Sequence, residues 1–144
     1  MYKIVEDKKK LQKACQEIED INEGYDIGKK LLKALAQSNS GIGLAANQIG
    51  INKRVCVVNV TSPIIFINPK IVGAFGKTSF NEGCLSFPGE SIITERYTNI
   101  IVQAHGIGSP KIFNSQKSIL ECICVQHEID HLDGITMFER RYIK

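Results

Sequence analysis

The sequence predicts an α+β protein, in which two N-terminal helices precede several strands and one late helix. Apolar residues recur every three or four positions in residues 8–20 and 26–38, which is the period of an amphipathic helix. β-Branched residues cluster in residues 55–60 and 64–67, as is typical of strands. Helical spacing returns at 118–131. Because helices and strands do not alternate along the chain, a βαβ architecture is disfavoured.

In the first predicted helix, 8–20, the apolar residues at helical spacing are Leu11, Ala14, Cys15 and Ile18. Residues 22–24 predict a break before the second helix, and the turn residues 38–41 end it. A turn containing proline separates the first two strands. Strands are predicted at 55–60, 64–67, 70–80, 91–96 and 99–105, and the last helix at 118–131.

Composition limits the classes of protein that the sequence can encode. The 144 residues suffice for one domain, 1–144, but not for two. Hydrophobic residues make up 43%, as in an ordinary globular protein, and the mild net charge of +3 gives no strong case for nucleic-acid binding. We expect neither a secretory signal nor a membrane span. Five cysteines without a signal predict a reducing compartment, the cytoplasm, with thiols free or bound to metal.

Two of the three histidines stand four residues apart in the late helix, in the stretch QHEIDHLDG. On a helix, His127 and His131 share one face and can bind the same metal ion, while Glu128 lies close enough to contact a water there. Leu120, Ile123 and Leu132 make the helix apolar around this polar stripe, so the polar side chains cannot be buried there without partners. Asp130 and Asp133 are candidates to orient an imidazole, or they face solvent.

A catalytic metal site usually needs a third protein ligand. Cys124 shares the histidine face but is too far along the helix axis from His131, and Cys122 points away from it, so we interpret both as core residues. His105 is interpreted as a surface or structural histidine. The remaining candidate segment is residues 81–86, which contain Cys84 after the turn-forming Gly83.

A third segment, GIGLAANQ at residues 41–48, is rich in small residues and ends in an amide. Together with EGCLS at 82–86 and QHEIDHLDG at 126–134, it resembles the three signature motifs of peptide deformylase. That family removes the formyl group from N-terminal formyl-methionine and releases formate. The resemblance implies antiparallel strands packed around a central metal-binding helix, with N-terminal helices.

The resemblance also implies roles for individual residues. Cys84, His127 and His131 would bind one divalent ion, Fe²⁺ in the native enzyme, which Zn²⁺, Ni²⁺ or Co²⁺ can replace. Glu128 would transfer protons, and the Gln48 side chain and Leu85 N–H would stabilise the oxygen of the reacting formyl group. An ion pair between Glu82 and Arg96 is expected. The substrate contacts would come from Ile42, Gly43, Glu82, Gly83, Leu120, Ile123, Cys124 and His127.

The expected partner is an N-formylmethionyl nascent peptide, with no nucleic acid or membrane partner, and we expect a monomer. Two features depart from the family pattern. Ser91 stands where many bacterial members have an arginine, and the chain ends at Lys144 without the long C-terminal helix of typical members. This suggests a short, bacteriophage-like form and puts docking on the host ribosome in doubt.

Two alternative functions are consistent with the same residues. One is another HExxH metallo-amidase or peptidase, which would cleave unformylated peptides or other amides. The other is a metal-stabilised binding module without catalysis. The presence of both Glu128 and Gln48 argues against the second alternative, because a structural metal site needs neither.

Overall fold

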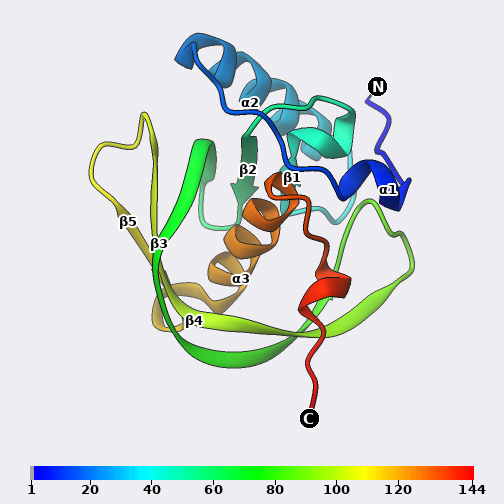
Figure 1. Cartoon of the computed structure of the whole chain (residues 1–144), viewed down its shortest axis with the longest axis vertical. Coiled ribbons are helices and arrows are strands. Elements are labelled where there is room, and N and C mark those ends of the chain that lie inside the picture. The colour runs from blue at the N-terminus through cyan, green and yellow to red at the C-terminus, as the bar shows by residue number, and fades with distance from the viewer. Residues whose placement is uncertain (1) are drawn as a thin grey trace.

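Antiparallel strands form one sheet in residues 2–144, the part of the chain that this computed structural model describes (Figure 1). The strands follow each other in the sheet in the order of the sequence, β1-β2-β3-β4-β5, and every neighbouring pair is antiparallel. The predicted α+β class is confirmed. The bounds of the strands are β1 Gly43–Ala45, β2 Val55–Asn59, β3 Pro63–Gly83, β4 Ser91–His105 and β5 Lys111–Asn114.

The strands β3 and β4 form a long ribbon that curves around the helix α3 (Ser115–Leu132), as Figure 1 shows. Their pairing runs from Ile67 opposite His105 to Gly83 opposite Ser91. The five predicted strand ranges therefore merge into three strands. The register shifts just after Ile67, where Asn68 adopts a positive φ of 50° and Pro69 lacks an N–H donor. A bulge of this kind absorbs the irregular residues without ending the strand.

The helix α3 occupies the centre of the fold, and its residues 121–132 are all buried. Its regular part begins after Ser118, whose backbone is extended and whose hydroxyl accepts a hydrogen bond from Glu121 N–H. This agrees with the start predicted at residue 118. Because the helix is enclosed by β-structure, polar residues on it are buried as well.

The strand β2 lies between two helices and is buried on both faces. Val55 and Val57 pack toward α2 (Ile21–Ala36), and Cys56 and Val58 pack toward α3. Successive side chains of a strand point to opposite faces, so a strand covered on both sides needs an unbroken apolar run. Figure 1 shows α2 and α3 on opposite sides of β1 and β2.

The prediction of a helix over residues 8–20 is wrong beyond the first turn. The helix α1 covers only Lys8–Leu11. The chain then runs without regular helix to Asp20: Gln16 pairs with Lys53 in a bridge, and the Asn68 side chain holds both backbone groups of Ile18. Three of the four apolar residues that suggested a helix, Leu11, Cys15 and Ile18, are nonetheless buried, whereas Ala14 is exposed. Tertiary contacts therefore override a weak periodic pattern.

The predicted break at residues 22–24 is also wrong, because α2 begins at Ile21. The Asp20 side chain caps this helix by accepting a hydrogen bond from Asn22 N–H. Gly24 lies inside the helix, where a Cβ would come within 2.8 Å of Ile67 Cδ1. The absence of a side chain at Gly24 thus lets α2 pack closely on β3, and the glycine does not form a turn.

Two short 3₁₀ helices complete the fold, η1 at Ala46–Ile49 and η2 at Met137–Arg140. η1 follows β1 directly, and η2 lies in the C-terminal segment after α3. Within residues 2–144, no helix combines the length and apolar character required to cross a bilayer.

Candidate metal centre and active site

Two histidines and one cysteine meet at the centre of the fold. His127 and His131 lie one turn apart on α3, with ring centroids 4.9 Å from each other. Cys84 directly follows β3, and its Sγ lies 3.4 Å from His131 Nε2. One ligand atom from each of the three residues lies within 4.8 Å of the other two. The structure thus brings together the three side chains that the sequence predicts as metal ligands.

The donor atoms of this cluster fit a divalent transition metal. A thiolate with two imidazoles suits iron or zinc far better than magnesium or calcium. His131 is fully buried, and its Nδ1 has no hydrogen-bond partner among residues 2–144. Burial and the neighbouring His127 lower the pKa of His131 well below its usual value. The ring is therefore neutral, which is the form that binds a metal.

The surroundings of His127 are negatively charged. Burial alone lowers the pKa of His127, but the charge of Glu128 and the hydrogen bonds with Cys84 and Glu82 raise it well above its usual value. The groups that favour a proton on this ring also favour a bound cation in its place.

Glu82 orients the His127 ring. Its Oε1 lies 2.8 Å from His127 Nδ1, so Nε2 is the nitrogen that remains for a metal. The Arg96 guanidinium donates two hydrogen bonds to Glu82, at 2.6 and 2.9 Å, and Thr94 donates a third. Burial alone would raise the pKa of Glu82, but Arg96 and the hydrogen bond with His127 lower it to about 2. The predicted pair of Glu82 and Arg96 is confirmed.

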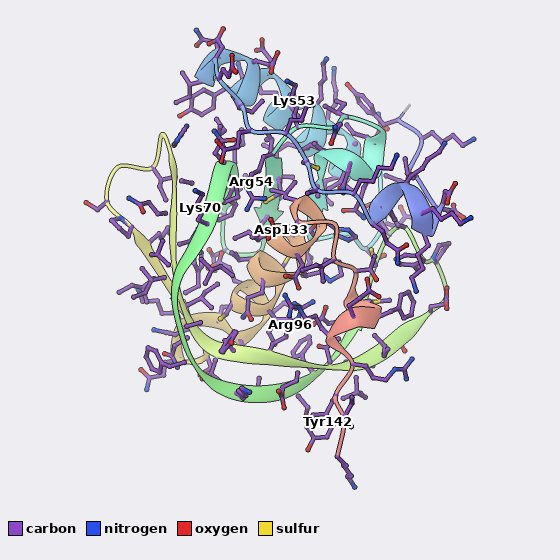
Figure 2. All side chains as sticks on the ribbon, in the orientation of Figure 1. Lys53, Arg54, Lys70, Arg96, Asp133 and Tyr142 are labelled. Carbon is purple, nitrogen blue, oxygen red and sulfur yellow. The ribbon has the colours of Figure 1, made fainter. Side chains whose placement is uncertain are left out.

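The two aspartates suggested as orienting residues have other partners. Asp130 accepts hydrogen bonds from Arg96 and Arg140, and Asp133 pairs with Arg54 at 2.6 Å, where Figure 2 shows the labelled Arg54 beside it. Neither is hydrogen-bonded to an imidazole, and Asp133 is exposed, as the alternative prediction had it. The residue that orients the His127 ring is Glu82 on β3, which is distant from α3 in the sequence. Only the folded chain brings the two residues together, so their spacing in the sequence did not indicate the contact.

Glu128 is a buried carboxyl beside the cluster. It is 3% exposed, and its Oε1 makes no hydrogen bond with any of residues 2–144. Burial raises the pKa of Glu128 to about 7, although the charge on His127 opposes this. A carboxyl with such a pKa can both accept and deliver a proton near neutral pH. Gly43 on β1 makes room for it, since a Cβ there would lie 2.7 Å from Glu128 Oε2.

Gln48 is fixed by hydrogen bonds at both ends of its amide. Its Oε1 accepts a bond from Ala45 N–H at 2.9 Å, which identifies Nε2 as the donor end. Nε2 lies 3.1 Å from Ser86 Oγ and 3.4 Å from Cys84 Sγ. The amide donor is therefore directed at the metal cluster. Leu85, next in the chain after Cys84, lines the same space.

A cavity of about 470 Å³ opens onto this cluster. Every residue predicted for the site lines it except the fully buried His131. The predicted lining residues are Ile42, Gly43, Gln48, Glu82, Gly83, Cys84, Leu85, Leu120, Ile123, Cys124, His127 and Glu128.

Part of the cavity wall was not predicted from the sequence. Phe80 stands two residues before Glu82 on β3, so both side chains point to the same face, and this period could have identified it. Asn81 also lies on β3, between Phe80 and Glu82. The other missed residues belong to turns and loops, which carry no periodic signal: Ser40, Gly41, Phe87, Pro88, Gly89 and Glu90.

The remaining cysteine and histidine interpretations agree with the structure. Cys122 is fully buried, with its Sγ near the carbonyl oxygens of Tyr97 and Phe113. Cys124 is buried against the cavity and is not part of the ligand cluster. His105 is exposed, and its Nδ1 lies 3.2 Å from Asn68 Nδ2.

A model of the polypeptide deformylase family matches residues 1–142. The chain belongs to this family. A peptide deformylase of Neisseria meningitidis is 37% identical over 138 residues, covering 91% of this chain and 80% of the relative. That of Endomicrobium trichonymphae is 40% identical over 130 residues, covering 86% and 76%.

Solved deformylase structures share the fold. The Plasmodium falciparum structure gives a TM-score of 0.87 at 30% identity, covering 97% of this chain and 86% of that one. The Thermotoga maritima structure gives a TM-score of 0.86 at 29% identity, covering 99% of both chains. Members of the family are metal-dependent hydrolases that remove N-formyl groups from nascent polypeptides, and this chain is such an enzyme. These matches favour the deformylase prediction over both alternatives.

Proposed function

We propose that Cys84, His127 and His131 bind the catalytic metal ion and that Glu128 transfers the protons of formyl-group hydrolysis. One observation carries this proposal: a thiol and two imidazoles converge within 4.8 Å, next to a buried carboxyl with a pKa of about 7. Within residues 2–144 this is the cluster that offers three such ligand atoms.

We propose Fe²⁺ as the native ion, with Zn²⁺, Ni²⁺ or Co²⁺ able to replace it. The sulfur and nitrogen donors support a borderline or soft divalent metal, and the family resemblance supports iron among these. When bound, the ion supplies Lewis acidity, which makes water a stronger acid and polarises a carbonyl group. Metal analysis after anaerobic purification identifies the ion; magnesium or calcium in its place would contradict the assignment.

Glu128 performs the proton transfers in this mechanism. It accepts a proton from the attacking water, whose oxygen forms a bond to the formyl carbon. The carbon–nitrogen bond then breaks, and Glu128 delivers the proton to the departing nitrogen. The products are formate and a free N-terminal amine. Burial makes this cycle feasible, because it brings the pKa of Glu128 to about 7.

Gln48 and Leu85 stabilise the negative charge that develops on the formyl oxygen. The Gln48 amide is held by Ala45 and Ser86 with its N–H groups facing the cluster, so it does not reorganise during the reaction. The Leu85 backbone N–H is the second donor. Preorganised donors of this kind typically contribute about 10² to 10³ in rate each.

The substrate enters the cavity with its methionine side chain against the apolar wall. That wall contains Ile42, Leu120, Ile123 and Cys124. The peptide backbone pairs as an added strand with Ile42, Gly43 and Gly83. Support comes from the sheet order: β1 is an edge strand, and within residues 2–144 its outer edge carries no further strand.

We also propose that the protein is a monomeric single domain that acts in the cytoplasm, where nascent chains are made. Light scattering after size exclusion tests the monomer, and a dimer mass would exclude it.

The decisive test of the proposed function is a formate-release assay on anaerobically purified protein. A formyl-Met peptide should yield stoichiometric formate, and the same peptide without the formyl group should stay intact. Cleavage of the unformylated peptide would instead support a peptidase. Formate release that persists after Cys84→Ala would remove this thiol from the mechanism.

A further inference from the structure

The C-terminal segment, residues 136–142, contacts the elements that carry the metal site. Met137 is 1% exposed and packs in a cluster with Leu11, Phe87 and Ile92. The Phe138 ring meets the Phe87 ring edge-on, with centroids 4.9 Å apart, and Phe87 lines the cavity. This segment is therefore anchored against the cavity wall.

The backbone of the same segment pairs with β4. Arg141 forms an antiparallel bridge with Thr94, and Tyr142 N–H donates to Ile93 O at 2.9 Å. Thr94 is one of the residues whose side chain holds Glu82. Figure 1 shows the red C-terminal segment crossing the β3–β4 ribbon, and Figure 2 labels Tyr142 beyond that crossing.

Arg140 binds helix α3 between the two metal-binding histidines. Its Nε and one terminal nitrogen donate to the two carboxylate oxygens of Asp130, each at 2.9 Å. Two parallel bonds fix the orientation as well as the position of a carboxylate. The Asp130 side chain is only 10% exposed, so its partners in the protein replace much of the contact with water.

Asp130 is connected to the metal site by hydrogen bonds through Arg96. Asp130 Oδ2 accepts a hydrogen bond from Arg96, whose other nitrogens hold Glu82, and Glu82 in turn holds His127 Nδ1. The result is a continuous chain of charged contacts from Arg140 to His127. In Figure 2, Arg96 lies between α3 and the β3–β4 ribbon.

Arg96 is shared between two buried carboxylates, and Arg140 decides how it is shared. With Arg140 in place, the Asp130 carboxylate pairs with two guanidinium groups, those of Arg96 and Arg140. Without Arg140, Asp130 has Arg96 alone as a charged partner and competes with Glu82 for it. Glu82 is then held less firmly, and so is the orientation of the His127 ring.

We propose that Arg140 is a positioning residue that raises the metal affinity of the site through Asp130, Arg96 and Glu82. This inference rests on the proposed function, since it takes His127 as a ligand. It assigns the C-terminal segment a role in the metal centre beyond covering the core. Outer partners of metal ligands typically change affinity by 10- to 100-fold, and Arg140 lies further out, so we expect a loss of about 10-fold.

The test is zinc affinity, measured by competition between the metal-free protein and a chromophoric chelator at a temperature at which every variant is folded by circular dichroism. Arg140→Gln and Arg140→Lys should each bind zinc about 10-fold more weakly than wild type. The lysine variant keeps the charge but loses the paired bonds, so it separates geometry from charge.

Arg141→Gln is the matched control. It removes the same charge one residue away, and the Arg141 side chain makes no ion pair or hydrogen bond with residues 2–144. It should bind zinc as wild type does. Wild-type affinity in both Arg140 variants would overturn the proposal, and so would an equal loss in Arg141→Gln. If wild type itself binds no zinc, the proposed metal site fails instead.

A double-variant cycle gives an independent readout. In an Asp130→Asn background, Arg140→Gln should weaken zinc binding little further, because the chain is already interrupted. Additive losses from the two substitutions would show that Arg140 acts by another route and would contradict the proposal.

Discussion

Gly43→Ala is expected to displace the proton-transferring carboxyl without touching the metal ligands. A Cβ at residue 43 would lie 2.6 Å from Cys124 Sγ and 2.7 Å from Glu128 Oε2. Ordinary carbon contacts are about 3.5 to 4.0 Å, so Glu128 must move by roughly 1 Å. Glu128 is buried at 3% exposure, and it cannot escape this shift by turning into solvent.

A displacement of this size should lower kcat for formate release by about 10²-fold, while the zinc content stays at the wild-type level. Overpacking should also lower the free energy of unfolding by about 1 to 3 kcal/mol, which chemical denaturation measures. If the zinc content is retained, the ligand cluster is intact. The lower kcat then reflects the displacement of Glu128 by the added methyl group on β1.

Gly73→Ala on β3 is the control for adding a methyl group to a strand glycine. Its Cβ would meet Ile101 Cδ1 at 3.1 Å, and residue 73 does not line the cavity. This variant should keep wild-type kcat. If Gly43→Ala also has wild-type kcat, the position of Glu128 does not limit the reaction and the reasoning is refuted.

Three further predictions concern the reaction itself. Glu128→Gln should lower kcat by about 10²- to 10⁴-fold with unchanged metal content, and unaltered turnover would exclude Glu128 from proton transfer. Gln48→Ala should lower kcat by about 10²- to 10³-fold with a smaller effect on KM; a loss confined to KM would make Gln48 a substrate-binding residue only. Iron-loaded enzyme should lose activity in air, because ferrous iron beside the Cys84 thiolate oxidises readily, whereas zinc-loaded enzyme should not. Full activity of the iron form after long exposure to air would contradict this.

The strongly patterned elements of the fold were predictable from the sequence. The β-branched run at 55–60 corresponds to a strand buried on both faces, and the late helix begins near residue 118 as predicted. The segment after Leu11 was not predictable, because its apolar residues have helical spacing but are buried by long-range bonds such as those from Asn68 to Ile18.

The glycine at residue 24 illustrates a second limit. In the sequence it indicates a break, but in the structure it allows α2 to pack on Ile67. A local rule cannot distinguish a glycine that ends a helix from one that makes room for a strand, because the neighbouring strand comes from residues more than 40 positions later.

The candidate site was more predictable than the fold because its residues carry chemistry in fixed spacings. His127 and His131 share a face on any helix, and Cys84 directly follows Gly83, which ends β3 and does not form the predicted turn. The contacts around the site were harder to foresee. Asp130 lies beside the histidines in sequence, yet Glu82 orients the ring, since only the folded ribbon brings β3 to α3.

The most direct measurement of the central claim is the X-ray absorption spectrum of the zinc-loaded protein. We expect one sulfur neighbour at about 2.3 Å and two imidazole nitrogens at about 2.0 to 2.1 Å. In Cys84→Ser the sulfur signal should vanish while both imidazole signals remain. A spectrum without sulfur in the wild type, or an unchanged sulfur signal in Cys84→Ser, would contradict the proposed metal centre.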